Sequence, residues 1–202
     1  ILFRLVGSEM CIRDRQGPAH IVHGDYTLRS APERLQQLAK APSVNDTLRA
    51  VIPPGSALLN QETVDRALAE DGRFAIINVW RNIAAEPVAN HPLALCDGQV
   101  VEPQDLVVFE IHMPDRIGEN YWSKYHDRHR FYSYPAMNRD EALLIKQWDS
   151  AGELARSAGR NSDRNSDGSC TFSFHSAFID PTTPEDVPDR WSIEVRCIAV
   201  YY

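Results

Sequence analysis

The sequence predicts a mainly β protein of the α+β class, a double-stranded β-helix (jelly-roll) barrel with a few flanking helices. Two observations predict this fold. From residue 73 onward, most of the chain consists of short apolar or alternating segments separated by turn residues, a pattern typical of strands. The segments with helical spacing are few and short. Several strands with a few helices on one face are typical of a jelly roll.

Each expected helix begins at a polar capping residue. Ser30-Ala-Pro-Glu33 predicts a capping box that opens a first helix. Asn60 is expected to cap a second helix, in which apolar residues recur at helical spacing. Asn138-Arg-Asp-Glu141 is expected to cap a third helix that runs to Trp148. A short strand is expected at 45–53, between the first two helices.

The other elements are expected to be strands. The run Phe74-Ala-Ile-Ile-Asn-Val-Trp80 is apolar over most of its length, which predicts a buried strand. Further strands are expected at 95–96, 106–112, 127–134, 170–179 and 192–202. The segment 160–169 is polar and internally duplicated, so an exposed loop is expected there.

The first residues are not expected to belong to the fold. Residues 5–15 read LVGSEMCIRDR, which is similar to the translation of a sequencing-library transposase adaptor in one reading frame. A signal peptide and a native strand are the alternatives. Residues 1–6 are too short for the apolar core of a signal peptide, and no small-residue cleavage site follows. We therefore expect 1–15 to derive from the adaptor and 16–202 to form a single domain, truncated at its N-terminus.

Composition excludes several classes of function. The formal net charge is −7 at pH 7 and no basic stripe is present, which argues against a nucleic-acid partner. No apolar run approaches the roughly 20 residues of a membrane-spanning helix. Outside the adaptor-like stretch, the cysteines are Cys96, Cys170 and Cys197, an odd number without metal-ligand spacing. Reduced thiols and a cytoplasmic setting are therefore expected.

The triplet His23-Gly24-Asp25 is the first candidate for chemistry. On a strand, residues two apart point to the same face, so His23 and Asp25 can enter one cavity. Gly24 between them is expected to leave room for a metal and its ligands. Alone the triplet is a weak signal, and a surface loop is the alternative because Tyr26 and Thr27 follow.

His175 strengthens the metal interpretation. It lies in the apolar run Phe172-Ser-Phe-His-Ser-Ala-Phe178, where a hydrogen-bonded core histidine is the alternative. Two imidazoles and one carboxylate form the facial triad that binds non-haem Fe(II) and leaves positions open for other ligands. The predicted metal ligands and catalytic residues are therefore His23, Asp25 and His175.

An arginine lies where a cosubstrate carboxylate would bind. Arg190-Trp-Ser192 follows His175 by fifteen residues, with turn residues between them, so it opens the adjoining strand. A guanidinium binds a carboxylate through two hydrogen bonds and a hydroxyl adds a third, which suits 2-oxoglutarate. Arg196 is the rival for this role. Glu194 and Arg196 share one face of the strand, so an internal salt-bridge network is the alternative.

Weaker candidates remain for substrate binding and for a second metal site. Trp80, Arg81 and Tyr132 are core or barrel-wall residues unless they face the cavity, in which case Arg81 would meet an acidic substrate. His126-Asp-Arg-His129 also contains two histidines, but on a strand the two would face opposite sides.

Long motifs stand in the order that is found in one known family: Asn78-Val-Trp-Arg81, Pro92-Leu-Ala-Leu-Cys-Asp97, Tyr134-Pro-Ala-Met137 with Asp140-Glu-Ala-Leu143, Trp148-Asp-Ser150, His175-Ser-Ala-Phe178 with Asp180-Pro181, and Arg190-Trp-Ser-Ile-Glu-Val-Arg196. From about His20 to the C-terminus, the chain resembles the family of the cephem methoxylation protein, fungal gibberellin desaturase and AsaB-type hydroxylases. Two departures from the family are the missing region before His20 and the polar insertion at 160–169.

The resemblance implies an Fe(II)/2-oxoglutarate dioxygenase of secondary metabolism, with His23, Asp25 and His175 on the metal and Arg190 as the anchor of 2-oxoglutarate. The expected activity is hydroxylation or desaturation of a small organic molecule with dioxygen. Two alternatives stay open: a relative that binds a small molecule without turnover, and a hydrolase or isomerase that uses the same triad with another metal. Iron-dependent succinate formation separates the oxygenase from both.

Overall fold

The computed structural model describes residues 2–9, 17–44, 46–112, 117–157 and 170–201. Within these residues the protein is mainly β with few helices, as the sequence predicts. The elements in chain order are β1 (Leu2–Glu9), β2 (His23–Gly24), α1 (Ser30–Gln37), η1 (Thr47–Ala50), α2 (Gln61–Leu68), β3 (Arg73–Asn82), β4 (Leu93–Cys96), η2 (Gly98–Val100), η3 (Pro103–Asp105), β5 (Leu106–His112), β6 (Ile117–Ser123), β7 (Phe131–Ser133), β8 (Leu143–Asp149), α3 (Glu153–Ser157), β9 (His175–Ala177) and β10 (Ser192–Tyr201).

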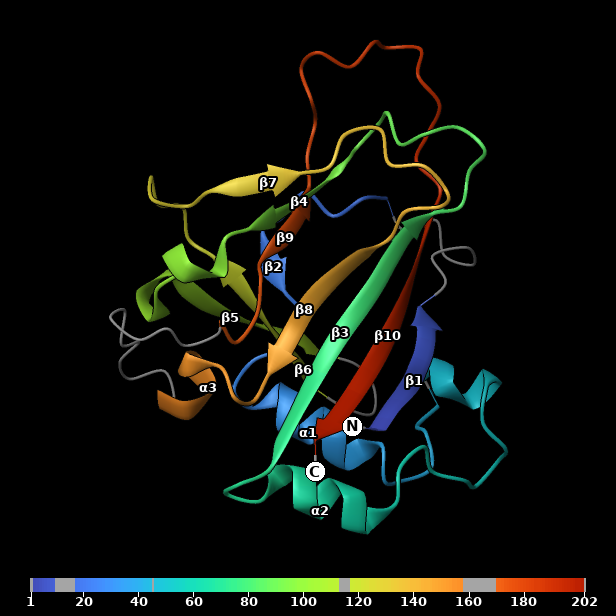
Figure 1. Ribbon diagram of the computed structural model, residues 1–202, viewed down its shortest axis with the longest axis vertical. Helices are drawn as coiled ribbons and strands as arrows, with labels where there is room; N and C mark the ends of the chain where they lie inside the picture. Colours follow the sequence, from blue (N-terminus) through green and yellow to red (C-terminus); the bar gives the residue numbers. More distant parts are fainter. Residues whose placement is uncertain (1, 10–16, 45, 113–116, 158–169, 202) are drawn as a thin grey trace.

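The strands form two antiparallel sheets. One has the order β1-β10-β3-β8 and the other the order β5-β6-β2-β9-β4-β7. Figure 1 shows the long strands β8, β3 and β10 side by side in the first sheet, with α1 and α2 near one end of it. Two short strands, β2 and β9, are neighbours in the second sheet although the residues between them make up most of the chain.

Two apolar clusters make up the core. The larger cluster joins α1 and α2 to the first sheet and includes Leu35, Val64, Phe74 and Ile76. The smaller cluster surrounds Trp80. Residues two apart on a strand share a face, so Ile76, Asn78 and Trp80 point to the same side of β3. The buried amide of Asn78 therefore lies between the two clusters, in a polar layer.

Both predicted N-terminal helices are present. Asn60 caps α2, since its Oδ1 accepts the Thr63 backbone N–H at 2.7 Å. The capping box of α1 lies three residues before the expected position. Thr27 Oγ1 accepts the Ser30 backbone N–H at 3.0 Å, and Ser30 Oγ accepts the Thr27 backbone N–H at 2.9 Å. Glu33 instead pairs with Arg29 on the surface of the helix.

Two predictions of secondary structure are wrong. The helix expected to run to Trp148 is strand β8, although the turn before it does form, with the Asn138 backbone N–H bonded to Glu141 at 2.9 Å. Leu143 and Ile145 alternate toward the core with a period of two, and β3 supplies backbone partners along this segment. The strand expected at 45–53 is the 3₁₀ helix η1, since the Asp46 side chain accepts a backbone N–H of the first turn.

Strand β1 covers part of the adaptor-like stretch. It lies at the edge of the first sheet and pairs with β10. Strand pairing uses backbone groups, which every residue except proline supplies in full, so the pairing does not decide where these residues come from. The adaptor origin of 1–15 stays a prediction. The loop predicted at 160–169 lies outside the described residues.

Among the described residues, no helix is both long enough and apolar enough to cross a membrane.

A buried carboxylate links the loop before β7 to η3. Asp105 is 3% exposed, and its Oδ2 accepts hydrogen bonds from Arg128, from His129 Nε2 at 3.1 Å and from the Glu102 backbone N–H at 2.8 Å. Burial acts to raise the pKa of Asp105, but the hydrogen bonds from Arg128 and His129 lower it below its ordinary value. The resulting stability is present above the unfolded pKa of about 4 and is lost as the pH falls through the lowered folded pKa.

Asp105→Ala is expected to lower the free energy of unfolding by about 3 kcal/mol, because it removes the buried carboxylate that Arg128 and His129 share, although Arg128 keeps its pairing with Glu102. Thermal unfolding should show the melting temperature lower by about 6–12 °C. The matched control is Asp127→Ala on the exposed surface nearby, expected to stay within about 0.5 kcal/mol of the unmodified protein. Equal melting temperatures for the two variants would contradict this account of Asp105.

Candidate metal centre

Backbone register brings the two candidate histidines together. His23 on β2 and His175 on β9 are directly opposed in the antiparallel ladder. Opposed residues point to the same face of a sheet, so both imidazoles face the interior between the sheets. Asp25 follows the end of β2 by one residue and faces the same side as His23. His175 therefore meets His23 and Asp25 at one point, although about 150 residues separate it from them along the chain.

The three side chains have the spacing of a metal site. One ligand atom from each of His23, Asp25 and His175 lies within 4.8 Å of the others, and no other group of this kind is found among the described residues. Nε2 of His23 is 3.6 Å from Oδ1 of Asp25, and Nε2 of His175 is 3.9 Å from the same oxygen. The ring centroids of the histidines are 4.4 Å apart.

The orientation of His23 and the protonation state of His175 also suit metal binding. Nδ1 of His23 lies 2.7 Å from the carbonyl oxygen of Ile21, which can only accept, so Nδ1 donates and Nε2 is the nitrogen that faces Asp25. His175 is 6% exposed, and burial lowers its pKa to about 4 against the opposing effect of Asp25. His175 is therefore neutral at pH 7, as an imidazole ligand must be.

Asp25 is held as a carboxylate. Burial acts to raise its pKa, but the Arg196 guanidinium, the two histidines and a hydrogen bond from Asn78 together lower it. Nη2 of Arg196 is 2.8 Å from Oδ2 of Asp25, and Nδ2 of Asn78 is 3.2 Å from the same oxygen. The Asp25 backbone N–H lies 3.4 Å from the side-chain oxygen of Gln147.

Gly24 has a different role from the one predicted. It lies on the opposite face of β2 from His23 and Asp25, so it does not leave room for a metal. A Cβ added at Gly24 would lie 3.3 Å from the ring of Phe172 and 3.7 Å from that of Phe174. The glycine instead allows these two rings to pack against the strand.

Two site residues, Asn78 and Gln147, were not predicted. Both are fully buried. Asn78 is the one polar residue of its strand between Phe74 and Trp80, and a lone amide in such a run is a signal that could have been used. No sequence signal marks Gln147, because it is the extra residue of a bulge in β8 that the pairing with β3 creates.

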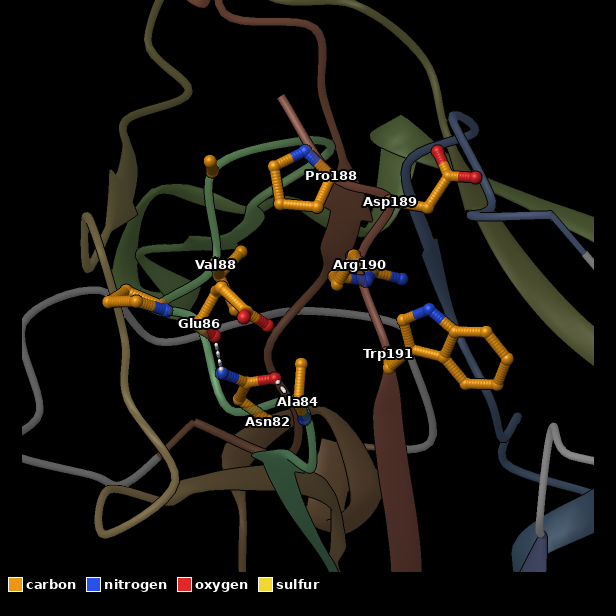
Figure 2. Close-up of a pocket in the computed structure, with 10 residues that line it drawn as sticks. Asn82, Ala84, Glu86, Val88, Pro188, Asp189, Arg190 and Trp191 are labelled. Carbon is orange, nitrogen blue, oxygen red and sulfur yellow. Dashed lines mark hydrogen bonds between the residues drawn. The ribbon is translucent and has the colours of Figure 1, made fainter. Parts of the chain in front are cut away.

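Arg190 lies away from the three clustered residues, just before β10. Its guanidinium donates a hydrogen bond to the His91 carbonyl and lies over the Trp80 ring, 5.5 Å from the centroid. It lines a pocket of about 90 Å³ with Asn82, Val88 and others. Figure 2 shows Arg190 within this pocket and the hydrogen bond between Asn82 and Glu86 below it.

Arg196 contacts the triad directly. Besides its ion pair with Asp25, its Nε donates to Oδ1 of Asn78 at 3.1 Å, and Nη2 is 3.8 Å from Glu194. The internal salt-bridge network that was the alternative for this face therefore exists around Arg196 and Glu194. Ser192 opens β10 opposite Asn82, between Arg190 and this network.

Residues 56–200 match the model of a family described as the oxidoreductase/YMDC permease-like domain. The chain belongs to this family. Among its relatives is a hydroxylase/desaturase, poxK of Penicillium oxalicum, 31% identical over 147 residues that make up 63% of this chain and 42% of poxK. Another is the Fe(II)/2-oxoglutarate-dependent dioxygenase nvfI of Aspergillus novofumigatus, 29% identical over 187 residues, 90% of this chain and 60% of nvfI. The predicted resemblance to hydroxylase/desaturase proteins is thus confirmed.

A solved structure supports the fold of this oxidoreductase/YMDC permease-like domain. The iron and alpha-ketoglutarate-dependent endoperoxidase NvfI matches with a TM-score of 0.69 and 24% identity, over all of this chain and 62% of that protein. The chain thus spans less than two thirds of the length of the relatives named here.

The weaker candidates in this domain lie apart from the triad. Arg81 is exposed on the opposite face of β3 from Trp80 and donates to the Arg139 carbonyl. Tyr132 on β7 opposes Leu95, which in turn opposes His175, so it shares the interior face of the second sheet two strands away. Trp80 is buried under Arg190.

The second histidine pair in the sequence has its own partners. His129 bonds Asp105, and Nδ1 of His126 accepts the backbone N–H of Arg128 at 3.2 Å. Their ring centroids are 6.2 Å apart. This pair belongs to the structural network of Asp105 and not to a metal cluster.

Proposed function

We propose that this protein is an Fe(II)/2-oxoglutarate-dependent oxygenase that hydroxylates or desaturates a small organic molecule of secondary metabolism. The observation that carries the proposal is the convergence of His23, Asp25 and His175 on one point. The relatives poxK, a hydroxylase/desaturase, and nvfI, an Fe(II)/2-oxoglutarate-dependent dioxygenase, support the same reaction class.

The donor set fits Fe(II). Two neutral imidazoles and one carboxylate are the facial ligands of non-haem iron, and their arrangement leaves positions open. Nε2 of His23 and Nε2 of His175 both face Oδ1 of Asp25, so the three donors surround one point. The hydrogen bond from Nδ1 of His23 to the Ile21 carbonyl orients the ring from behind, as is usual for metal-binding histidines.

Bound iron and 2-oxoglutarate would supply the oxidation, in which dioxygen is reduced while 2-oxoglutarate is decarboxylated to succinate. The residues of the protein would bind 2-oxoglutarate and the organic substrate and orient them. We assign the anchor of the distal carboxylate to Arg190, with Ser192 as an additional donor. On β3, Trp80 follows Asn78 on the same face, and Asn78 contacts Asp25. The Arg190 guanidinium lies over Trp80, two residues along β3 from Asn78.

The organic substrate is assigned to a neighbouring cavity of about 370 Å³. Its lining includes Leu95, Met137 and Leu143 together with the polar Tyr134 and Glu141. The lining combines apolar side chains with polar groups, as sites for small organic molecules do. Because Leu95 opposes His175 across one strand pair, this cavity begins beside the proposed metal centre.

The proposal also includes the jelly-roll architecture and the cellular setting. The orders β10-β3-β8 and β2-β9-β4-β7 in two antiparallel sheets support the two halves of a jelly roll, with β1 at the edge of the first sheet and with β5 and β6 extending the second. Cys96, Cys170 and Cys197 are free thiols, which supports the cytoplasm. The net charge of −7 supports a small-molecule partner over nucleic acid.

The test is succinate release by the purified protein with Fe(II), ascorbate and 2-oxoglutarate. Slow release is expected without the organic substrate, and omission of iron or addition of a chelator should stop it. Metal binding without any succinate, with or without candidate substrates, would contradict the oxygenase and favour a hydrolase or isomerase. Binding of a small organic molecule without metal would favour the non-catalytic relative.

A further inference from the structure

We propose, on the basis of the function above, that Arg196 is a positioning residue that holds one oxygen of Asp25 so that the other faces the metal. Oδ2 of Asp25 receives Nη2 of Arg196 at 2.8 Å and Nδ2 of Asn78 at 3.2 Å. Oδ1 lies on the other side of the carboxylate, 3.6 Å from Nε2 of His23 and 3.9 Å from Nε2 of His175. The two oxygens thus have separate partners.

Arg196 is itself fixed on several sides. Its Nε donates to Oδ1 of Asn78 at 3.1 Å, and the Asn78 amide in turn donates to Oε1 of Glu194 at 2.5 Å. Glu194 is also 3.8 Å from Nη2 of Arg196, and the Tyr26 ring lies under the guanidinium with its centroid 5.2 Å away. Asn78 is fully buried between two apolar clusters, so this network is held by the core of the protein.

The arrangement has a consequence for coordination. A carboxylate can bind a metal through one oxygen or through both. With Oδ2 bonded to two donors, Asp25 offers a single oxygen, and its rotation about the Cβ–Cγ bond is restricted. A one-oxygen carboxylate leaves three facial positions open, two for a chelating 2-oxo acid and one for dioxygen. Partners that orient a ligand in this way also raise metal affinity.

The same contacts separate Arg196 from the cosubstrate. A guanidinium clamps a carboxylate through two parallel N–H donors. The Nε and Nη2 donors of Arg196 form such a pair, but they are bonded to Asn78 and Asp25. Arg196 therefore acts on the metal ligand, while the role of carboxylate anchor is assigned to Arg190.

Two measurements test this inference. The first is the affinity of the metal-free protein for Mn(II), measured by calorimetry. The second is kcat and the KM for 2-oxoglutarate, measured from succinate release. Arg196→Met is expected to weaken Mn(II) binding about 10- to 100-fold, as loss of an orienting group does. The KM for 2-oxoglutarate should change less than about threefold. Arg196→Lys keeps one donor for Oδ2 and is expected to recover part of the Mn(II) affinity.

The outcomes distinguish the inference from the proposed function. If Arg196→Met binds Mn(II) as the unmodified protein does, or raises only the KM for 2-oxoglutarate, the positioning role is overturned and the oxygenase stands. If the unmodified protein binds no Mn(II), the metal centre and this inference both fall. Should Arg196→Met not fold, as judged by circular dichroism, Arg196→Gln decides. Its side chain is shorter and uncharged, so Mn(II) affinity equal to that of the unmodified protein would overturn the role.

Discussion

Asp25→Ala is expected to remove both metal binding and succinate release. Asp25 supplies the negative charge and one of the three donors at the point where His23 and His175 meet. Changes to groups that only orient a ligand already cost about 10- to 100-fold in metal affinity, so loss of the ligand should exceed a hundredfold. Arg196 would also lose its ion partner at 2.8 Å, which adds positive charge to the site.

Two further variants make this experiment specific. Asp25→Asn keeps an oxygen for Arg196 and removes the charge, so it should retain the fold yet bind Mn(II) at least about tenfold more weakly. His112→Ala is the surface control, because this side chain is 68% exposed on β5 and pairs with Glu110. Mn(II) titration and succinate release are measured for all three variants. Equal succinate release by Asp25→Ala and the unmodified protein would rule out the proposed metal centre.

The second large effect is expected for Arg190→Ala, which should raise the KM for 2-oxoglutarate at least tenfold. A lost hydrogen bond to a charged group costs about 1.5–3 kcal/mol, and each 1.4 kcal/mol is a factor of ten. Mn(II) affinity should stay within about twofold, because Arg190 lies over Trp80, two residues along β3 from Asn78. Steady-state kinetics of succinate release against 2-oxoglutarate concentration measures the first effect.

Arg190 and Arg196 serve as controls for each other. Arg190→Ala is expected to change KM for the cosubstrate, and Arg196→Met to change metal affinity. Arg49→Ala on the exposed surface of η1 should change neither. If Arg190→Ala left the KM unchanged while Arg196→Met raised it, the two assignments would have to be exchanged.

The sequence predicted the two N-terminal helices and several strands because their patterns are local, whereas β6 was not among the expected strands. The alternation and composition of 106–112 and the apolar run at Phe74–Trp80 are properties of short segments, and both segments are strands. The segment ending at Trp148 shows the limit of this reasoning. Its cap predicts a helix, and the turn forms, but pairing with β3 draws the following residues into a strand. The partner strand lies more than sixty residues earlier and leaves no local signal.

The candidate site likewise has features that the sequence predicts and features that depend on the assembled sheet. Residue type and spacing identified His23, Asp25 and His175, since the i, i+2 rule places the first two on one face and an apolar strand places the third inside. Sequence spacing alone could not say that His23 and His175 are opposed, because the ladder between β2 and β9 is a property of the assembled sheet. Their convergence depends on that register.

The sequence by itself determined which residue types are available to this site and on which face of its strand each one lies. Only the tertiary structure decided that Arg196 contacts Asp25 while Arg190 lies over Trp80. Both arginines are on or next to β10 and both alternate inward, so periodicity does not distinguish them. The difference arises because the register of β10 with β3 places Arg196 opposite Asn78, in the polar layer between the two apolar clusters.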